Sequence, residues 1–205
     1  MTVIVDYGVG NLFSLKSSLD RIGAKSRVSG DAAELCGADR IILPGVGAFG
    51  DAAEKLRGSR LAEVIIKQAA EGKPILGICL GMQLLFEKSF EYGEHKGLGL
   101  IGGEIRPIAE SVPKGTKIPH IGWNSLRFKN GGSRIFKYIK DGDYVYFVHS
   151  YHGVSCGESM TATADYGAEL CAAVENGNVF GCQFHPEKSG DVGLNILRGF
   201  CELGV

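Results

Sequence analysis

The chain has 205 residues, and 44% of them are hydrophobic, which is enough apolar material for a sizeable core. The formal net charge is −1, so the composition does not suggest binding to nucleic acid or to an anionic membrane. The apolar run Thr2–Val5 is too short for a secretory signal, and no stretch approaches the roughly 20 apolar residues of a membrane helix. Six cysteines without a regular spacing are expected to be reduced thiols, as in a cytoplasmic protein.

In the first 90 residues, short apolar runs alternate with stretches that have helical spacing. Strands are predicted at 2–5, 26–29, 40–43 and 75–78, and helices at 12–22, 31–36, 61–70 and 82–87. Residues 45–50 are expected to form a glycine-dense loop. This alternation predicts a parallel, doubly wound sheet with helices on both faces, in which a site lies where the strands end.

After Gly93 the pattern changes to β segments without intervening helices. We expect β structure at 97–107, 118–128 and 144–148, a hairpin over 170–184 that turns at Asn176-Gly177, and helices near 133–139 and 195–203. No repeat or linker interrupts the chain. Residues 1–205 are therefore expected to form one α/β domain, with a mostly parallel sheet, flanking helices and an antiparallel β extension.

The segment Gly77-Ile78-Cys79-Leu80-Gly81 joins a predicted strand to a predicted helix. A nucleophile on such a sharp turn needs small residues two positions before and after it, because the chain folds back tightly there. The amino terminus of the following helix favours a thiolate and offers N–H groups to an oxyanion. Taken alone, the pattern fits a buried core cysteine equally well.

A second stretch, His185-Pro186-Glu187, follows the predicted strand at 179–184. A base at a strand end with a carboxylate two residues later can complete a thiol triad. His185 would take the proton of Cys79, and Glu187 would orient the imidazole and stabilise its cation. An isolated His-Pro-Glu is more often a surface turn, so the hypothesis depends on its combination with the cysteine.

Spacing argues against two other kinds of site. Gly8-Val9-Gly10 lacks the third glycine of a dinucleotide-binding fingerprint. Cys182-x-x-His185 and His149-x-x-His152 could be drawn together as a zinc tetrad. Residues three apart on a strand point to opposite faces, however, so Cys182 and His185 are not expected to share a metal.

The two motifs together resemble those of the class I, triad-type glutamine amidotransferases. Three further segments make the chain similar to the glutaminase subunits of imidazole glycerol phosphate synthase, which act in histidine biosynthesis. They are Pro-Gly-Val-Gly-Ala-Phe at 44–49, Pro-His-Ile-Gly-Trp-Asn at 119–124 and Tyr-Phe-Val-His-Ser-Tyr-His at 146–152. The resemblance covers nearly the whole chain.

The resemblance implies that glutamine is hydrolysed to glutamate and ammonia through a thioester on Cys79, with His185 and Glu187 completing the triad. It implies oxyanion donors on the backbone, and substrate contacts from side chains and backbone, without a cofactor or a metal. The implied oxyanion residues are Leu80, Val46 and Gly47, and the implied substrate-binding residues are Gln83, Glu91, Ser150 and Tyr151.

The resemblance also implies a partner, a (β/α)₈ cyclase/synthase subunit that forms a heterodimer with this chain and receives ammonia through an internal passage. Candidates for the surface that binds it are Asn11, Trp123, Tyr146 and Lys188. Trp123 and Tyr146 are equally well suited to a core, and Asn11 to a helix N-cap. The glycines of the 45–47 loop would permit a peptide flip that switches the oxyanion donors.

Two alternatives stay open. The chain could be the glutaminase of another triad system, serving pyridoxal phosphate, anthranilate or aminodeoxychorismate synthesis, although residues 44–49 and 146–152 fit those enzymes less well. It could also be a non-catalytic protein of the same fold that binds or senses through Cys79. Such a protein would not need His185 and Glu187 together with the glycine loop.

Overall fold

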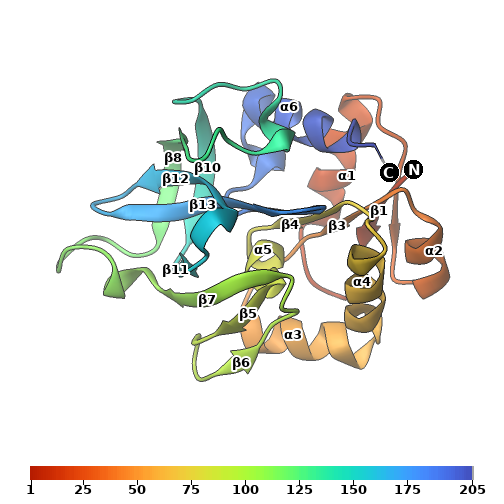
Figure 1. Ribbon diagram of the computed structural model, residues 1–205, viewed down its shortest axis with the longest axis horizontal. Helices are drawn as coiled ribbons and strands as arrows, with labels where there is room; N and C mark the ends of the chain where they lie inside the picture. Colours follow the sequence, from red (N-terminus) through yellow and green to blue (C-terminus); the bar gives the residue numbers. More distant parts are fainter. Residues whose placement is uncertain (205) are drawn as a thin grey trace.

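A computed structural model describes residues 1–204. Its main sheet has eight strands in the order β2-β1-β3-β4-β14-β13-β12-β9 (Figure 1). Five strands pair in parallel: β2 (Ser26–Ser29), β1 (Thr2–Val5), β3 (Arg40–Leu43), β4 (Ile75–Ile78) and β14 (Val179–Cys182). Three continue the sheet antiparallel: β13 (Glu169–Asn176), β12 (Met160–Asp165) and β9 (Arg127–Phe128). The mostly parallel sheet with an antiparallel extension is confirmed.

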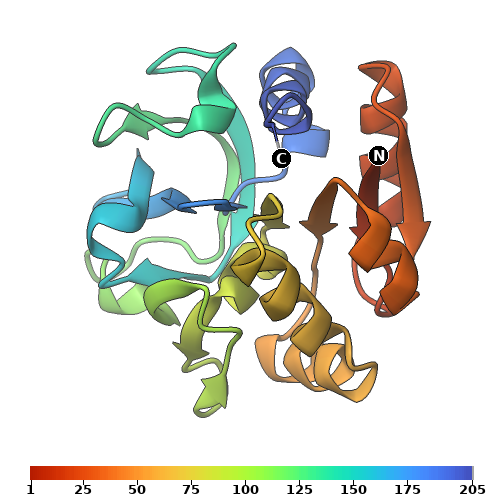
Figure 2. The same cartoon turned by 45° about the vertical axis from the view of Figure 1, so that its right-hand side comes forward.

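Helices cover both faces of this sheet, as the doubly wound prediction requires (Figure 2). One face packs against α2 (Ala32–Gly37), α3 (Phe49–Gly58), α4 (Leu61–Ala70) and α5 (Leu80–Leu85). The other face packs against α1 (Leu12–Arg21) and α6 (Gly190–Cys201). Alternate strand residues divide between the two cores, so that Val3 and Val5 face one side and Ile4 the other. None of the helices within residues 1–204 combines the length and apolar character needed to cross a bilayer.

Two smaller sheets complete the molecule. One has four strands in the order β11-β7-β5-β6, and the other pairs β10 with β8. Their strands are β5 (Phe86–Ser89), β6 (His95–Lys96), β7 (Ile101–Pro107), β8 (His120–Ser125), β10 (Tyr144–His149) and β11 (Tyr151–Val154). Single 3₁₀ turns lie at Ile108–Glu110, Arg134–Phe136, Gly157–Ser159 and Pro186–Lys188. Because only Ser150 lies between β10 and β11, residues 148–151 form the junction of the two small sheets.

The expected loop at 45–50 is too long, because α3 already begins at Phe49. Phe49, Ala52, Ala53 and Leu56 are all buried on one side of this helix. Their spacing of three and four residues is helical. Glycines at both ends of the segment favour a loop instead, so the sequence pattern did not predict this helix.

Three other helix boundaries also differ from the predictions. Helix α5 begins at Leu80 and ends at Leu85, so Phe86 belongs to β5 instead of a helix extending to residue 87. Helix α6 begins at Gly190, five residues before the predicted start. The helix near 133–139 is a single 3₁₀ turn at Arg134–Phe136.

Cys79 alone connects β4 to α5, and its backbone has the strained angles φ +53° and ψ −111°. A Cβ on Gly81 would lie 1.8 Å from the carbonyl oxygen of Leu43, and one on Gly77 would lie 2.6 Å from that of Gly81. The two glycines therefore permit strand β3, strand β4 and helix α5 to approach one another at backbone distance. This contact is the physical reason for the small residues on either side of the cysteine.

We expect Gly81→Ala to destabilise the fold by about 3 kcal/mol or more, because the added methyl group overlaps backbone that cannot move independently. Gly58→Ala is the matched control. Its Cβ would meet nothing within 4 Å at the end of α3, so it should raise stability by up to about 1 kcal/mol. Urea unfolding followed by circular dichroism measures both changes, and equal stability of the two variants would contradict this account of the turn.

Candidate active site

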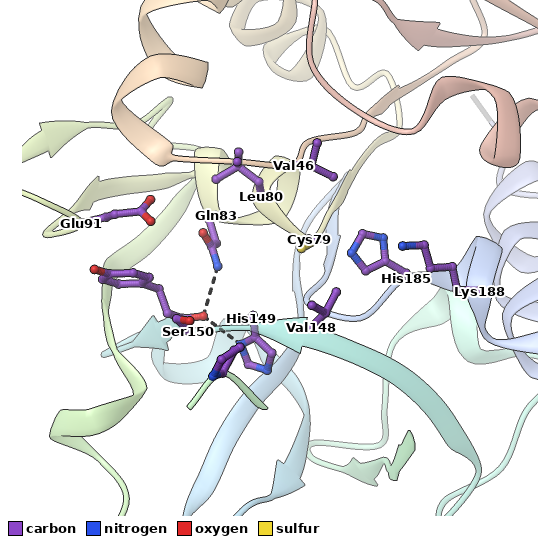
Figure 3. Close-up of a pocket in the computed structure, with 13 residues that line it drawn as sticks. Val46, Cys79, Leu80, Gln83, Glu91, Val148, His149, Ser150, His185 and Lys188 are labelled. Carbon is purple, nitrogen blue, oxygen red and sulfur yellow. Dashed lines mark hydrogen bonds between the residues drawn. The ribbon is translucent and has the colours of Figure 1, made fainter. Parts of the chain in front are cut away.

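A cavity of about 340 Å³ opens where strand β4 ends (Figure 3). The main sheet supplies Cys79 and His185, and the connection between the small sheets supplies the opposite wall. The cavity is lined by Val46, Gly47, Cys79, Leu80, Gln83, Glu91, Pro119, Val148, His149, Ser150, Tyr151, His185 and Lys188. It thus lies at the carboxyl ends of parallel strands, the expected position of a site in a sheet of this class.

Cys79 is buried to 8% exposure, and its backbone holds it in place between two neighbours. Its N–H donates to the carbonyl oxygen of Cys182 on β14 at 2.7 Å, and its own carbonyl accepts from the Gln83 N–H at 3.1 Å. As the residue before α5, Cys79 lies at the positive end of a helix, although this helix is short. The sulfur is therefore presented to the cavity from a rigid turn.

His185 and Glu187 form a buried pair beside the cysteine. Imidazole Nδ1 donates to Glu187 Oε1 at 2.7 Å, and the two side chains are only 3% and 4% exposed. The His185 N–H donates to the carbonyl oxygen of Tyr146 at 3.0 Å, and its carbonyl accepts from the Ser189 hydroxyl at 2.6 Å. His185 is thereby held in place through both its ring and its backbone.

Burial lowers the pKa of His185, but its interactions with Cys79 and Glu187 outweigh this effect and raise the pKa to about 9. At neutral pH the ring is therefore cationic and faces the thiol. A cysteine beside an imidazolium that is itself stabilised by a carboxylate can act as an activated nucleophile.

The backbone groups expected to bind an oxyanion lie along the same cavity. Leu80 is the first residue of α5, so its N–H has no acceptor within the helix. Gly47 has a φ of +95° and lines the cavity with Val46. The start of that loop is held by Tyr7, whose hydroxyl donates to the carbonyl oxygen of Pro44 at 2.8 Å. Burial, with a smaller contribution from Cys79, raises the Tyr7 pKa, so the phenol stays neutral.

Two expected substrate-binding side chains are held by specific partners. Gln83 is buried, and its Nε2 donates to the carbonyl oxygen of Tyr151 at 3.1 Å. Glu91 accepts from the Phe49 N–H at 2.5 Å, and burial raises the pKa of its carboxyl group. Glu91 thus lines the cavity and also binds the amino terminus of α3.

The opposite wall contains a row of buried polar rings. His149 Nδ1 donates to the carbonyl oxygen of Tyr151 at 2.9 Å, and its Nε2 lies 2.9 Å from His120 Nδ1. Burial lowers the pKa of His149 to about 3 and that of His120 to about 4, so both rings are neutral. His152 instead lies 2.8 Å from the Ser111 hydroxyl. Among residues 1–204, no three His, Cys, Asp or Glu side chains lie together in a group that could hold a metal, so His149, His152 and Cys182 do not form one.

Of the four residues expected to bind a partner, Lys188 lines this cavity. Trp123 is 55% exposed, so it is not a core residue, and it packs edge-on to Tyr146 at 6.2 Å between ring centroids. Lys188 Nζ lies 6.0 Å from the centre of the Tyr146 ring. Asn11 is exposed and also accepts from the Ser14 N–H at 3.3 Å as the N-cap of α1. Both interpretations of Asn11 are compatible with this position.

Three residues of the site have no catalytic or substrate-binding role implied by the resemblance. Tyr7 and His149 reach it from strand ends that are distant in the sequence. Gln183 is fully buried, and its Nε2 lies 3.8 Å from Cys79 Sγ. The one available signal for Gln183 was an amide within an apolar strand, directly before Phe184 and His185.

Residues 3–202 match the family model described as glutamine amidotransferase class-I. The chain belongs to the class I glutamine amidotransferases. The expected family and its fold are thereby confirmed for nearly the whole length of the chain.

Among relatives of this amidotransferase, the imidazole glycerol phosphate synthase subunit HisH of Wolinella succinogenes is 50% identical and aligns over 100% of both chains. The protein of the same name from Aquifex aeolicus is 50% identical over 97% of this chain and 95% of its own. The solved structure of PurLQS from Thermotoga maritima has a TM-score of 0.75 at 24% identity, covering 97% of this chain and 96% of that one. That structural similarity supports the amidotransferase fold.

The buried ion pair predicts a specific pH dependence. A His185 pKa of about 9 lies above the ordinary 6.5, so protonation of the ring stabilises the fold below about pH 6.5, and this stabilisation is lost as the pH rises through about 9. Glu187→Gln removes the counter-charge, so the midpoint of the His185 titration should move to lower pH and the loss of stability should become shallower. NMR titration of labelled histidine and thermal unfolding from pH 6 to 10 measure the two effects. An unchanged midpoint in Glu187→Gln would contradict the pairing.

Proposed function

We propose that this chain is the glutaminase subunit of an imidazole glycerol phosphate synthase. It would hydrolyse glutamine and pass ammonia to a cyclase subunit of histidine biosynthesis. The observation that carries the proposal is that Cys79 and His185 line one cavity, with Glu187 bonded to His185, in a chain that is 50% identical, end to end, to a protein of that name. We assign all 205 residues to one glutaminase domain.

The proposed reaction uses Cys79 as nucleophile. Its thiolate attacks the side-chain carbonyl carbon of glutamine, and the tetrahedral oxyanion is held by the backbone N–H of Leu80 and by those of Val46 and Gly47. Imidazolium His185 gives its proton to the departing ammonia, which leaves a glutamyl thioester. Neutral His185 then takes a proton from water, the resulting hydroxide cleaves the thioester, and glutamate leaves.

The opposite end of glutamine is assigned to Gln83, Glu91 and the backbone of Ser150 and Tyr151. The carboxylate of Glu91 supplies negative charge toward the substrate ammonium. Its bond to the Phe49 N–H keeps it in place and joins the substrate pocket to the start of α3. The volume of about 340 Å³ suits an amino acid of this size.

A partner subunit is proposed because free ammonia would be protonated in water near neutral pH. The partner-binding surface is formed by Phe13, Trp123, Tyr146 and Lys188 around Gly190. Phe13 is 83% exposed and lines a surface pocket with Gly190, while a Cβ on Gly190 would lie 4.0 Å from the Trp123 ring. Exposed aromatic residues beside a cation are typical of interface hot spots. Lys188 also lines the glutaminase cavity, so a partner bound here would adjoin the ammonia that is released.

We assign the chain to the cytoplasm. All six cysteines are free, including the buried and closely spaced Cys156 and Cys171, which suits a reducing compartment. A triad glutaminase of another pathway is the competing function. The experiment below separates the two by the acceptor that stimulates the enzyme.

Glutamate release should be strongly stimulated when a (β/α)₈ cyclase subunit and its ribotide ligand are added. Cys79→Ala should lower the stimulated rate by about 1,000-fold or more, because the nucleophile is lost while the pocket remains. A coupled glutamate dehydrogenase assay measures both, with isothermal titration of glutamine into Cys79→Ala as the control for an intact pocket. Stimulation by a different synthase would assign the chain to that pathway, and turnover in Cys79→Ala would contradict the thioester route.

The 45–47 loop is proposed to switch between two conformations. Gly47 has a φ of +95°, and its Cβ would meet nothing within 4 Å, so replacing it acts on conformation and not on packing. Alanine disfavours this φ by about 1–2 kcal/mol. Flipping the peptide between Val46 and Gly47 would reverse the sign of φ at Gly47 and turn the Gly47 N–H around. This N–H would then be an oxyanion donor with two conformational states.

Gly47→Ala should therefore shift the loop toward the flipped form, raise the unstimulated glutaminase rate about tenfold and reduce the ratio of stimulated to unstimulated rate. Steady-state rates with and without the cyclase subunit and ligand give both numbers. Gly58→Ala, in the open space at the end of α3, is the control for a general effect of glycine replacement. Unchanged rates in both states would remove the loop from the mechanism.

A further inference from the structure

Gln183 is a buried polar residue to which the proposed mechanism gives no role. It lies between β14 and His185, and its side chain is completely inaccessible to solvent. Its backbone N–H donates to the carbonyl oxygen of Ala172 on β13 at 2.9 Å, so its position is fixed by the sheet. An amide so deeply buried must be hydrogen-bonded, or it destabilises the fold.

The Gln183 amide joins two groups of the site. Its Oε1 accepts from Gln83 Nε2 at 3.0 Å, and its own Nε2 lies 3.8 Å from Cys79 Sγ. Gln83 Nε2 also donates to the carbonyl oxygen of Tyr151 at 3.1 Å (Figure 3). The connection therefore runs from a backbone carbonyl through two side-chain amides to the sulfur.

The direction of this chain of bonds is set by the Tyr151 carbonyl. A carbonyl oxygen can only accept, so the NH₂ group of Gln83 must face it. The second hydrogen of the same NH₂ group then points to Gln183, which must present its oxygen. The NH₂ group of Gln183 is left facing Cys79. One backbone acceptor thus orients both amides.

Two chemical consequences follow. Cys79 Sγ has an N–H group directed at it from the side of β14, and such a donor stabilises a thiolate more than a thiol. Gln83 has both hydrogens engaged, so its Oε1 remains to accept from a donor group on the substrate. Rotation of the Gln183 amide would turn its oxygen toward the sulfur, and rotation of the Gln83 amide would remove the free Oε1.

We propose that Gln183 is a positioning residue of the glutaminase, which directs an N–H to the Cys79 thiolate and fixes Gln83 with its oxygen free for glutamine. This rests on the proposed function for the substrate, but the contact with Cys79 is independent of it. The other titratable groups that face the sulfur are His185 and Tyr7, and both stay in place when Gln183 is replaced.

The test uses Gln183→Met, which keeps the length of the side chain and removes its donor and acceptor, in complex with the cyclase subunit and its ligand. The midpoint of the pH profile for iodoacetamide alkylation of Cys79 should rise by about one unit. The kcat for glutamine should fall about tenfold through the thiolate, and KM should rise about tenfold through Gln83. Thr163→Val is the control. Thr163 lies on β12 of the same sheet, and its buried hydroxyl has no hydrogen-bond partner among residues 1–204. The alkylation midpoint, kcat and KM of this variant should match those of the wild type.

Coupling between the two amides is tested by combining variants. If Gln183 acts on KM only by orienting Gln83, the double variant Gln83→Met/Gln183→Met should have the KM of Gln83→Met alone, while the loss in kcat persists. KM effects that multiply would overturn the assigned orientation of Gln83.

Gln183→Glu, which keeps the shape of the side chain, replaces the methionine variant if that variant does not fold. It lacks the NH₂ group, so the alkylation midpoint should again rise. In the wild type, the NMR signals of the Gln183 NH₂ group should move when Cys79 is alkylated. A wild-type midpoint in folded Gln183 variants, or unmoved NH₂ signals, would overturn the proposal. The alkylation profile requires no glutamine turnover, so its outcome is separate from success or failure of the proposed glutaminase function.

Discussion

The active site depends on a single backbone contact, the approach of helix α5 to strands β3 and β4 around Cys79. With no side chain at Gly77 or Gly81, the helix starts one residue after the strand ends, and Cys79 takes a positive φ of 53°. A strained residue persists only where its surroundings fix it. The result is a sulfur at the start of a helix, at the edge of the sheet where other strand ends converge.

Around this turn, the pKa values of two buried histidines, His185 and His149, are shifted in opposite directions. His185 is buried with a carboxylate, so its pKa rises to about 9 and it carries a charge. Burial lowers the pKa of His149 to about 3, and the neighbouring imidazoles add to this while the Tyr151 carbonyl opposes it, so the ring stays neutral. The side of the cavity beside Cys79 therefore carries the His185 cation, whereas the His149 ring opposite is uncharged. Of these two histidine rings, only the one beside Cys79 is protonated at neutral pH.

The same cavity is connected to two surfaces. Glu91 joins it to the start of α3, and the 45–47 loop lies between that helix and the cysteine. Lys188 extends from the cavity to the exposed Tyr146 and Trp123. A partner seated on these aromatic residues would contact Lys188, which follows Glu187 directly and His185 by three residues in the turn at Pro186–Lys188. Proximity of this kind suits the transfer of ammonia without release to water.

The sequence by itself determined the doubly wound sheet, the turn around Cys79 and the His185-Pro186-Glu187 motif, because each depends on local periodicity or on residues adjacent in the chain. Sequence patterning did not place helix α3, whose apolar spacing is masked by glycines, or the early start of α6. It also left Trp123 between core and surface, since a large aromatic residue suits both. Only the tertiary structure decided that Gln83, Gln183 and Cys79 share one line of contacts, and that Glu91 binds the Phe49 N–H at the start of α3. These contacts join strands and loops up to 104 residues apart, and no local pattern records which distant groups a fold brings together.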